Sequence, residues 1–454
     1  AQRLALMGQH IAAVTRPSSR YDNATRMRLC PGPRAQGGSA QSHLTRGRAQ
    51  TLLRRDAQDL ARNSTVARML LRRVAQMLVG DGAVCTSTTP NPGWNTIFDD
   101  RFRRWADATS PDTLGHCDIR REKSLWELLT CAVMSWGTDG DELWLLTKGG
   151  QVQVIESERI VSPGWAPATA LDGGGSIVEG VELDRYGAHA GYHVADWDIH
   201  GAIRAERDAV RRVGAGYARL LTCPIGMRTG LIRGEPFLQA VIDRIERLDK
   251  YEESTAIAAE IATLFAALVK SENPAQLQAD MEGATSDQPD SPVRDVSIEP
   301  GSIQYLEHAG DITQIKPEFP TTNFREYVQH QLIMMGAELG LPLVTVCFEA
   351  TQLSWSNIKA LYALSQRCLE PAQASLARTI RWVRAFKARQ WMLEGSIPSI
   401  DDYERCEVVL PQAPVVDFKS EVEGYALAIE KNLMTQDDAT QRLGTGRAAD
   451  IRAA

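Results

Sequence analysis

The chain has 454 residues, 43% of them hydrophobic and 24% charged, which allows two or three domains with well-buried interiors. No stretch approaches the roughly 20 apolar residues that would cross a bilayer, since the best candidate, 256–269, is interrupted by Glu260. The eight cysteines are scattered without a CxxC pair and no signal peptide is evident, so we expect a cytoplasmic setting and reduced cysteines.

The net charge of −7 is unevenly distributed along the chain. Residues 1–60 contain ten arginines and only three acidic residues, Asp22, Asp56 and Asp59. The first 45 or so residues are also rich in Gly, Pro and Ser, without an apolar period, which predicts a basic arm. Such an arm can bind nucleic acid or an acidic partner, or it can simply be solvated.

Helical spacing of apolar residues predicts a helical run over 50–78, which Gly80-Asp-Gly ends. Further helical stretches follow between Phe98 and Trp136. The period then changes, because Glu142–Thr147 and Val152–Ile155 flank a Gly-Gly turn and predict a hairpin. More strands are expected within 176–194. A mixed α+β domain from about 50 to 230 is the result.

The longest helical pattern begins at Glu235-Pro236 and continues through Leu268, because proline is tolerated in the first turn of a helix. Residues 271–320 are irregular and acidic, with ten carboxylates against Arg294 and Lys316. Short strands are expected there at 296–298 and 303–306. A helix over 323–338 should follow.

Gly340-Leu-Pro342 is expected to end one helix before the next helix begins. A second long helix is predicted from about Ser356 to Leu393, with a kink at Pro371. The intervening loop contains the apolar residues 343–348, which could alternatively form a buried strand. One more helix is expected near 421–431.

Catalytic motifs are sparse. No Gly-Lys dipeptide is available for a phosphate-binding loop. Asp139, Asp141 and Glu142 are clustered as in metal-dependent nucleases, but a tight turn is the alternative reading. Four residues could in principle bind zinc, but their spacing matches no standard zinc-binding motif: His193, Asp196, Asp198 and His200. We therefore expect no cofactor, no metal and no enzymatic activity.

Several short motifs occur in a defined order along the chain. Leu53-Arg-Arg-Asp-Ala-Gln-Asp-Leu-Ala-Arg-Asn63 is followed by Val79-Gly-Asp-Gly82 and Gly137-Thr-Asp-Gly-Asp-Glu142. Arg233-Gly-Glu-Pro236 then precedes the long helix, and Ala337-Glu-Leu-Gly-Leu-Pro342 lies downstream. In this order the motifs resemble those of the lambda-type portal proteins of tailed phages, and the resemblance extends from about Leu52 to Leu393. The chain departs from the family pattern at Ser354-Trp-Ser-Asn-Ile-Lys359 and at Cys223-Pro-Ile-Gly-Met227.

This resemblance implies an α+β portal fold with a mixed α/β wing, a long helical stem, a small α/β clip, a kinked long helix and a helical crown. Carried onto this chain, it implies a basic arm at 1–49, a wing at 50–235, a stem helix at 236–270, a clip at 271–320, a returning stem helix at 321–339, a channel loop at 340–355, a kinked wing helix at 356–394 and a crown at 395–454. A metal-dependent enzyme acting on nucleic acid, or a capsid or adaptor protein outside a ring, is the alternative.

The resemblance further implies a virion protein at one capsid vertex, assembled in the host cytoplasm as a ring, usually of twelve subunits. Its expected partners are passing double-stranded DNA, the large terminase, the major capsid or scaffold protein and a head-completion (adaptor) protein, with no membrane. An acidic balance outside the arm suits a channel through which DNA must slide. Channel contacts are expected from Glu349, Thr351, Gln352 and Ser354. Terminase docking at the clip is expected from Asp280, Glu282, Asp287, Asp290 and Asp295.

Overall fold

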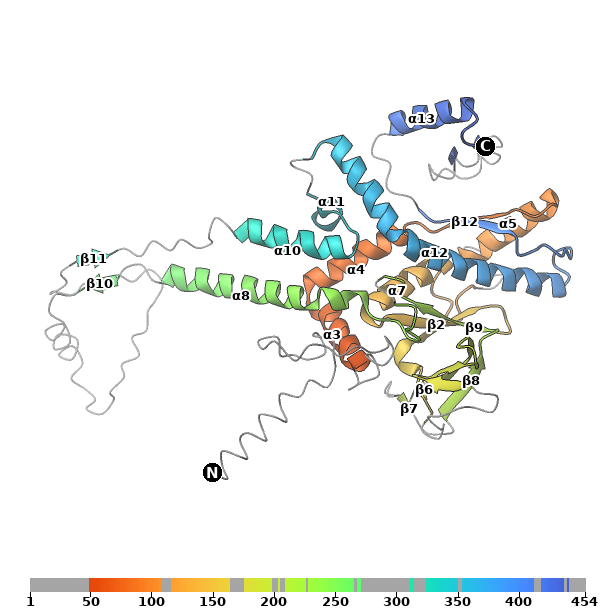
Figure 1. The fold of residues 1–454 in the computed structure, drawn as a ribbon, viewed down its shortest axis with the longest axis horizontal. Coiled ribbons are helices and arrows are strands. Elements are labelled where there is room, and N and C mark those ends of the chain that lie inside the picture. Colours follow the sequence, from red (N-terminus) through yellow and green to blue (C-terminus); the bar gives the residue numbers. More distant parts are fainter. Residues whose placement is uncertain are drawn as a thin grey trace, which may run out of the picture. The chain divides into compact units, whose positions relative to one another are not determined.

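The structure is a computed structural model of the chain. It describes residues 49–107, 116–163, 175–197, 203–204, 209–225, 228–264, 268–270, 311–313, 324–349, 353–411, 418–436 and 439–440. The chain divides into two compact units, one formed by residues 1–243 with 333–454 and the other by residues 244–332. Helices and strands are both present (Figure 1), and the expected mixture of helices and sheets is confirmed.

Four helices in the first part of the chain bury aromatic and aliphatic faces in the first unit. They are α3 (Ala49–Asn63), α4 (Thr65–Leu78), α5 (Pro92–Ala106) and α7 (Leu125–Thr138). The predicted run over 50–78 is interrupted, because Ser64 is the N-cap of α4 and its side chain accepts from the backbone N–H of Ala67. Ser124 and Glu127 form a reciprocal capping box at the start of α7.

The predicted hairpin is confirmed as β2 (Asp141–Leu146) and β3 (Val152–Glu156), and β2 also pairs with β9 (Ala218–Thr222). A second sheet runs in the order β4 (Ser176–Val178), β5 (Val181–Leu183), β6 (His189–Trp197) and β7 (Ile203–Arg204). Strand β8 (Val210–Gly214) pairs with β6. Apolar side chains of both sheets, including Leu143, Val181 and Tyr192, form one core cluster.

The C-terminal part of the first unit contains α11 (Leu343–Cys347), α12 (Trp355–Leu393), β12 (Cys406–Val409) and α13 (Phe418–Glu430). Helix α12 confirms the second long helix, and its ribbon changes direction part-way along (Figure 1). Pro371 lies inside it and removes one backbone hydrogen bond. Strand β12 pairs with β1 (Val84–Ser87) from the other end of the chain.

The second unit is built on two antiparallel helices. Helix α8 (Ile242–Leu264) continues into it from the first unit, and α10 (Phe324–Glu338) returns. Tyr251 of α8 stacks on Phe324, with ring centroids 5.7 Å apart, and also contacts Tyr327 at 4.6 Å. Strands β10 (Leu268–Lys270) and β11 (Asp311–Thr313) form an antiparallel pair.

The helix predicted from Glu235 through Leu268 is corrected at both ends. Phe237–Ala240 forms a 3-10 turn, and α8 begins only at Ile242. Leu268 is in a strand because it pairs with Thr313. The strands predicted at 296–298 and 303–306 lie outside the described residues, as does the basic arm through residue 48. No helix in the described part of the chain is long and apolar enough to span a membrane.

Candidate functional site

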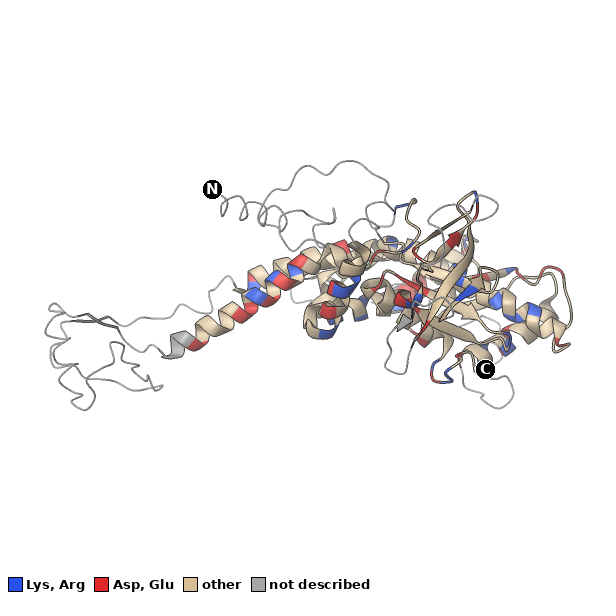
Figure 2. Cartoon of the chain, turned by 90° about the horizontal axis from the view of Figure 1, so that it is seen from below, with Lys and Arg blue, Asp and Glu red and all other residues tan. Residues whose placement is uncertain are grey.

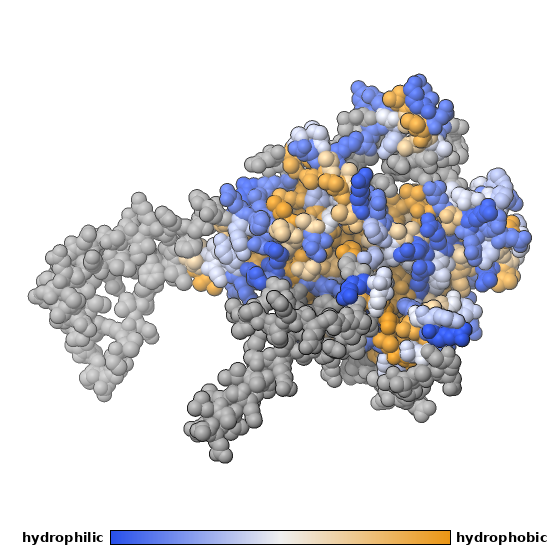
Figure 3. Space-filling model, in the orientation of Figure 1, coloured by the Kyte–Doolittle hydropathy of each residue, from blue (hydrophilic) through white to orange (hydrophobic). Residues whose placement is uncertain are grey.

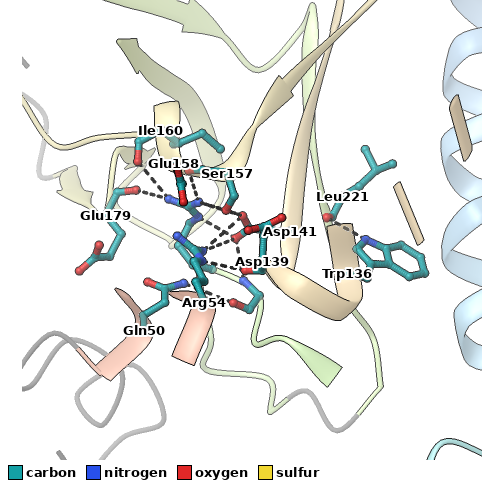
Figure 4. Close-up of polar contacts among 12 residues, drawn as sticks. Gln50, Arg54, Trp136, Asp139, Asp141, Ser157, Glu158, Ile160, Glu179 and Leu221 are labelled. Carbon is teal, nitrogen blue, oxygen red and sulfur yellow. Dashed lines mark hydrogen bonds and ion pairs between the residues drawn. The ribbon is translucent and has the colours of Figure 1, made fainter. Parts of the chain in front are cut away.

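A buried ion pair between Asp141 and Arg233 lies at the centre of a polar network in the first unit (Figure 4). Asp141 opens β2, and Arg233 precedes the 3-10 turn that leads to α8. Arg233 donates from Nε to Asp141 Oδ2 at 2.7 Å and from Nη2 to Oδ1 at 2.8 Å. Both side chains are buried, with exposed fractions of 1% or less. This two-point geometry is the strongest arrangement available to an arginine–carboxylate pair.

The remaining donors of Arg233 bind backbone carbonyls of two neighbouring turns. Nη1 donates to the carbonyls of Ile160 and Glu179, and Nη2 donates to the carbonyl of Ser157. The Ser157 hydroxyl in turn donates to Asp141. One guanidinium therefore links β2, the turn after β3 and the turn between β4 and β5.

Arg54 of α3 completes the network from the helical side. It donates to the backbone carbonyl of Asp139 at 2.7 Å, and its Nη2 lies 3.4 Å from Asp141 Oδ1. Burial and the neighbouring Arg233 charge lower the pKa of Arg54 to about 10. Burial by itself would raise the pKa of Asp141, but Arg233 and Arg54 outweigh it and lower that pKa to about 2.

The carboxylates that sequence grouped as a possible metal site serve separate partners. Asp141 is enclosed by arginines, whereas Glu142 accepts from Ser135 Oγ at 2.7 Å and from Trp144 Nε1 at 2.6 Å. Burial raises the pKa of Glu142 to about 7, which favours a protonated carboxyl. Desolvation likewise raises the pKa of Asp139. The geometry therefore supports a structural turn at these positions.

The geometry of the described residues also gives no support to the hypothesis of a zinc site. His193 is buried and lies 3.6 Å from Glu182, and burial lowers its pKa. Asp196 pairs with Arg211 at 2.7 Å. Asp198 and His200 are outside the described residues. Within the described ranges, no group of three or more His, Cys, Asp or Glu side chains is arranged to hold a metal ion.

The segment predicted as a channel loop, 340–355, is helical in its first part. Leu343–Cys347 forms α11, so it is neither an open loop nor the strand considered as the alternative. Val346 is buried, while Phe348 has a φ of 56° and is 72% exposed. The Arg73 guanidinium of α4 lies 3.8 Å above the Phe348 ring. Arg73 therefore contacts the aromatic side chain directly after α11.

The four proposed channel residues are only partly described. Glu349 follows α11 and is half-buried. Ser354 is the N-cap of α12, and its side chain accepts from the backbone N–H of Asn357 at 3.3 Å. Thr351 and Gln352 lie outside the described residues.

The model for "Phage portal protein, lambda family" matches residues 28–373. The chain belongs to this family. The portal role predicted from the sequence is thereby confirmed, and both halves of the Asp141–Arg233 pair lie within the matched region.

Three solved structures are similar to this portal family member at low sequence identity. A chain of the virion of a native gene transfer agent particle is 13% identical, with 91% of this chain and 97% of that chain covered and a TM-score of 0.46. A chain from the neck of an empty gene transfer agent particle is 14% identical, covering 87% and 94%, with a TM-score of 0.46. An HK97 family phage portal protein from Corynebacterium diphtheriae is 12% identical, covering 80% and 100%, with a TM-score of 0.34.

The acidic residues proposed for the portal clip all fall outside the described residues. These residues are Asp280, Glu282, Asp287, Asp290 and Asp295. Their role in docking a partner stays a prediction.

A second buried ion pair in this portal protein was not predicted from the sequence. Arg384 of α12 pairs with Asp99 of α5, and the Ser87 hydroxyl also accepts from it. The Arg384 guanidinium lies 4.6 Å above the Phe98 ring. One available signal was that Asp99 follows directly after Phe98, within the aromatic stripe of α5. A buried carboxylate at such a position requires a cationic partner.

Proposed function

We propose that this portal protein assembles into a ring, of twelve copies as the resemblance implies, around a DNA channel at one capsid vertex. A separate terminase would drive the genome through the ring, and the same channel would serve ejection. Head-completion and tail proteins would dock on the ring, with the major capsid or scaffold protein around it. Structural support comes from apolar side chains that the single chain leaves exposed.

Three of the large exposed apolar residues lie directly after α11 and on the first half of α12. Phe348 is 72% exposed, Trp355 is 73% exposed and Leu364 is 61% exposed. Figure 3 shows apolar residues grouped in this region of the first unit. Contiguous apolar surface of this kind is typical of a contact with another protein. A second copy of the chain is the occupant that the ring proposal requires.

Helix α8 of the second unit also has surface that its own chain leaves uncovered. Acidic and basic residues alternate along it (Figure 2), and Ile257 is 48% exposed. Beyond Leu248, which is fully buried, no further described side chain of α8 is buried. A helix whose later turns are not covered by its own chain is suited to side-by-side packing with neighbouring copies.

The ring is tested by light scattering and by electron micrographs of the purified protein. Leu364→Glu introduces a charge into the proposed contact and should shift the mass from a ring toward the 50.0 kDa chain. Tyr186→Glu is the matched control, since Tyr186 is 79% exposed in a turn between strands. A monomer at every concentration and salt, with no ring in micrographs, would show the proposal to be wrong.

Terminase docking at the clip is tested separately. Removing residues 280–295 should leave the thermal unfolding temperature and the ring mass unchanged and weaken terminase binding, measured by co-sedimentation. Normal terminase binding by the shortened ring would contradict the proposed clip role. ATP hydrolysis should belong to the terminase, because the portal chain has no Gly-Lys dipeptide. An ATPase activity abolished by a substitution in this chain would overturn that assignment.

A further inference from the structure

The stretch between Leu60 and Gly80 contains four arginines and no acidic residue. The four are Arg62 at the end of α3 and Arg68, Arg72 and Arg73 on α4. Arg62, Arg68 and Arg72 are exposed and Arg73 is half-buried. None of them forms an ion pair with a carboxylate among the described residues. We call these four arginines the α4 basic stripe.

Backbone contacts fix part of the stripe in place. Arg68 donates from Nη2 to the carbonyl of Arg62 at 2.5 Å and contacts the carbonyl of Ala61 at 3.5 Å. Its guanidinium is thereby held at the α3–α4 junction, beside the backbone of Arg62. Arg72 follows Arg68 after one helical turn, a rise of about 6 Å along the same face.

Arg73 extends the stripe toward α11. Its Nη1 donates to Gln76 Oε1 at 2.9 Å, and its guanidinium stacks on the Phe348 ring. Its Nε is buried and has no hydrogen-bond partner in the described residues. The guanidinium is therefore positioned by a ring and an amide, neither of which neutralises its charge.

We propose that the α4 basic stripe binds the phosphate backbone of double-stranded DNA without sequence preference. The four cations lie between Asp59 and Asp81 with no carboxylate among them in the sequence, and a polyanion relieves the repulsion between their like charges. Guanidinium groups pair well with phosphate oxygens through their fixed fork of donors. The stripe goes beyond the conduit role, because a slippery channel does not require a surface that holds DNA.

An acidic protein is the competing occupant of a basic surface. Protein interfaces depend on apolar and aromatic anchors in their centre. Between Arg62 and Gly80 no large apolar side chain is exposed, and the exposed neighbours Thr65 and Gln76 are polar. The exposed Phe348 ring contacts the stripe at Arg73, whereas no large exposed apolar residue lies beside Arg62, Arg68 or Arg72 in this stretch. Charge that is mostly without apolar anchors favours the DNA backbone over a protein.

The test measures binding of the full chain to short fluorescent DNA duplexes by anisotropy, over a range of salt concentrations. The variant is Arg62→Gln with Arg72→Gln, two exposed arginines that carry no side-chain ion pair in the described structure. The control is Arg103→Gln with Arg104→Gln on α5, which removes the same charge from another exposed helix face. All proteins keep residues 1–48, so the basic arm contributes equally.

We expect the stripe variant to bind DNA at least about tenfold more weakly at low salt. The slope of log affinity against log salt should also fall by about two, one for each lost phosphate contact. Two unrelated duplex sequences should respond alike. The control should change neither quantity.

Equal weakening by stripe and control variants would overturn the proposal, because the effect would then reflect net charge alone. Unchanged DNA binding together with lost binding of poly-glutamate would assign the stripe to an acidic protein instead and would also overturn it. Thermal unfolding checks that the variants fold. Ring mass by light scattering is measured on the same samples, so a failure of ring assembly is distinguished from a failure of DNA binding.

Discussion

Gly140 and Gly234 are in direct backbone contact, which brings the Gly-Asp-Glu turn against the Arg-Gly-Glu-Pro segment. A Cβ atom added at Gly140 would lie 2.5 Å from the carbonyl atoms of Gly234. Gly140 also has a φ of 85°, a conformation that favours glycine. The adjacent residues, Asp141 and Arg233, form the buried ion pair. Two motifs that lie 92 residues apart therefore make one structural joint.

Replacing Gly234 should test this joint directly. In Gly234→Ala the new methyl group would overlap the carbonyl oxygen of Gly140, which is backbone and cannot rotate away. We expect a loss of about 1–3 kcal/mol in the free energy of unfolding, measured by urea denaturation. Gly216→Ala is the control, since nothing lies within 4 Å of its Cβ position, and it should change stability by less than about 0.5 kcal/mol. Equal effects would contradict the tight approach.

The Asp141–Arg233 pair should be far more costly to break than to replace. Arg233→Met leaves a buried carboxylate without its main partner and should cost about 3–5 kcal/mol, whereas the double variant with Asp141→Leu should lose less. The pKa of Asp141 is lowered to about 2. The stability that its ionised carboxylate contributes is therefore complete above the ordinary pKa of about 4 and is lost as the pH falls toward 2. Urea denaturation at several acidic pH values should show this loss in the natural chain and not in the double variant. A double variant as unstable as Arg233→Met would contradict this account.

Glu142 predicts a pH dependence of the opposite sign. Its pKa is raised to about 7, so the stability it contributes as a protonated group is complete below about pH 4.5 and is lost as the pH rises through 7. Glu142→Gln keeps an acceptor for Trp144 Nε1 and removes the ionisation. Above pH 7 the variant should be more stable than the natural chain, by an amount on the order of 1–3 kcal/mol. Exposed Glu122→Gln is the control, and parallel stability curves for the natural chain and Glu142→Gln would refute the prediction.

Replacing the buried cation Lys387 by a hydrophobic residue should increase the stability of the protein. Its Nζ lies 4.8 Å from the Trp105 ring centroid and 4.7 Å from that of Trp391, and it donates to Gln390 at 3.0 Å. Burial nevertheless lowers its pKa to about 8, so desolvation outweighs these contacts. We expect Lys387→Met to raise the thermal unfolding temperature at pH 7, by a stability gain of about 1–3 kcal/mol. Lys250→Met, at a 76% exposed side chain, should have no such effect, and a lower unfolding temperature for Lys387→Met would show that the cation–ring contacts dominate.

Sequence patterns predicted those helices and strands whose apolar period and caps lie within the element itself. The bounds of α12 were predicted within one residue because a long amphipathic period ends at recognisable caps. The helix expected through Leu268 was wrong because Leu268 pairs with Thr313, and such distant pairing leaves no trace in a local period. The pairing of β1 with β12 was missed for the same reason.

The site shows the same division between local and distant information. Asp139, Asp141 and Glu142 are close together in the sequence, but their side chains contact separate partners. The partners of Asp141, which are Arg54 and Arg233, lie far away in the sequence. Arg54 and Arg233 convert a candidate metal cluster into a closed ion-pair network. The shared order of the family motifs was the one sequence signal that connected Gly140-Asp141 with Arg233-Gly234, and it did not indicate that they touch.

The segment proposed to face the DNA channel, 340–355, gives the last prediction. Glu349 follows α11, and Gln352 lies between it and the Ser354 cap of α12. Replacing both Glu349 and Gln352 by Lys should leave the ring mass unchanged and slow DNA packaging in a virion assay, because added phosphate contacts raise affinity where sliding is needed. The control is Glu404→Lys with Ser399→Lys, which makes the same charge change at two exposed positions between α12 and β12. Normal packaging by the Glu349 and Gln352 variant, or equal slowing by the control, would count against placing this segment in the channel, since a cation that meets passing DNA must act on its movement where a distant one does not.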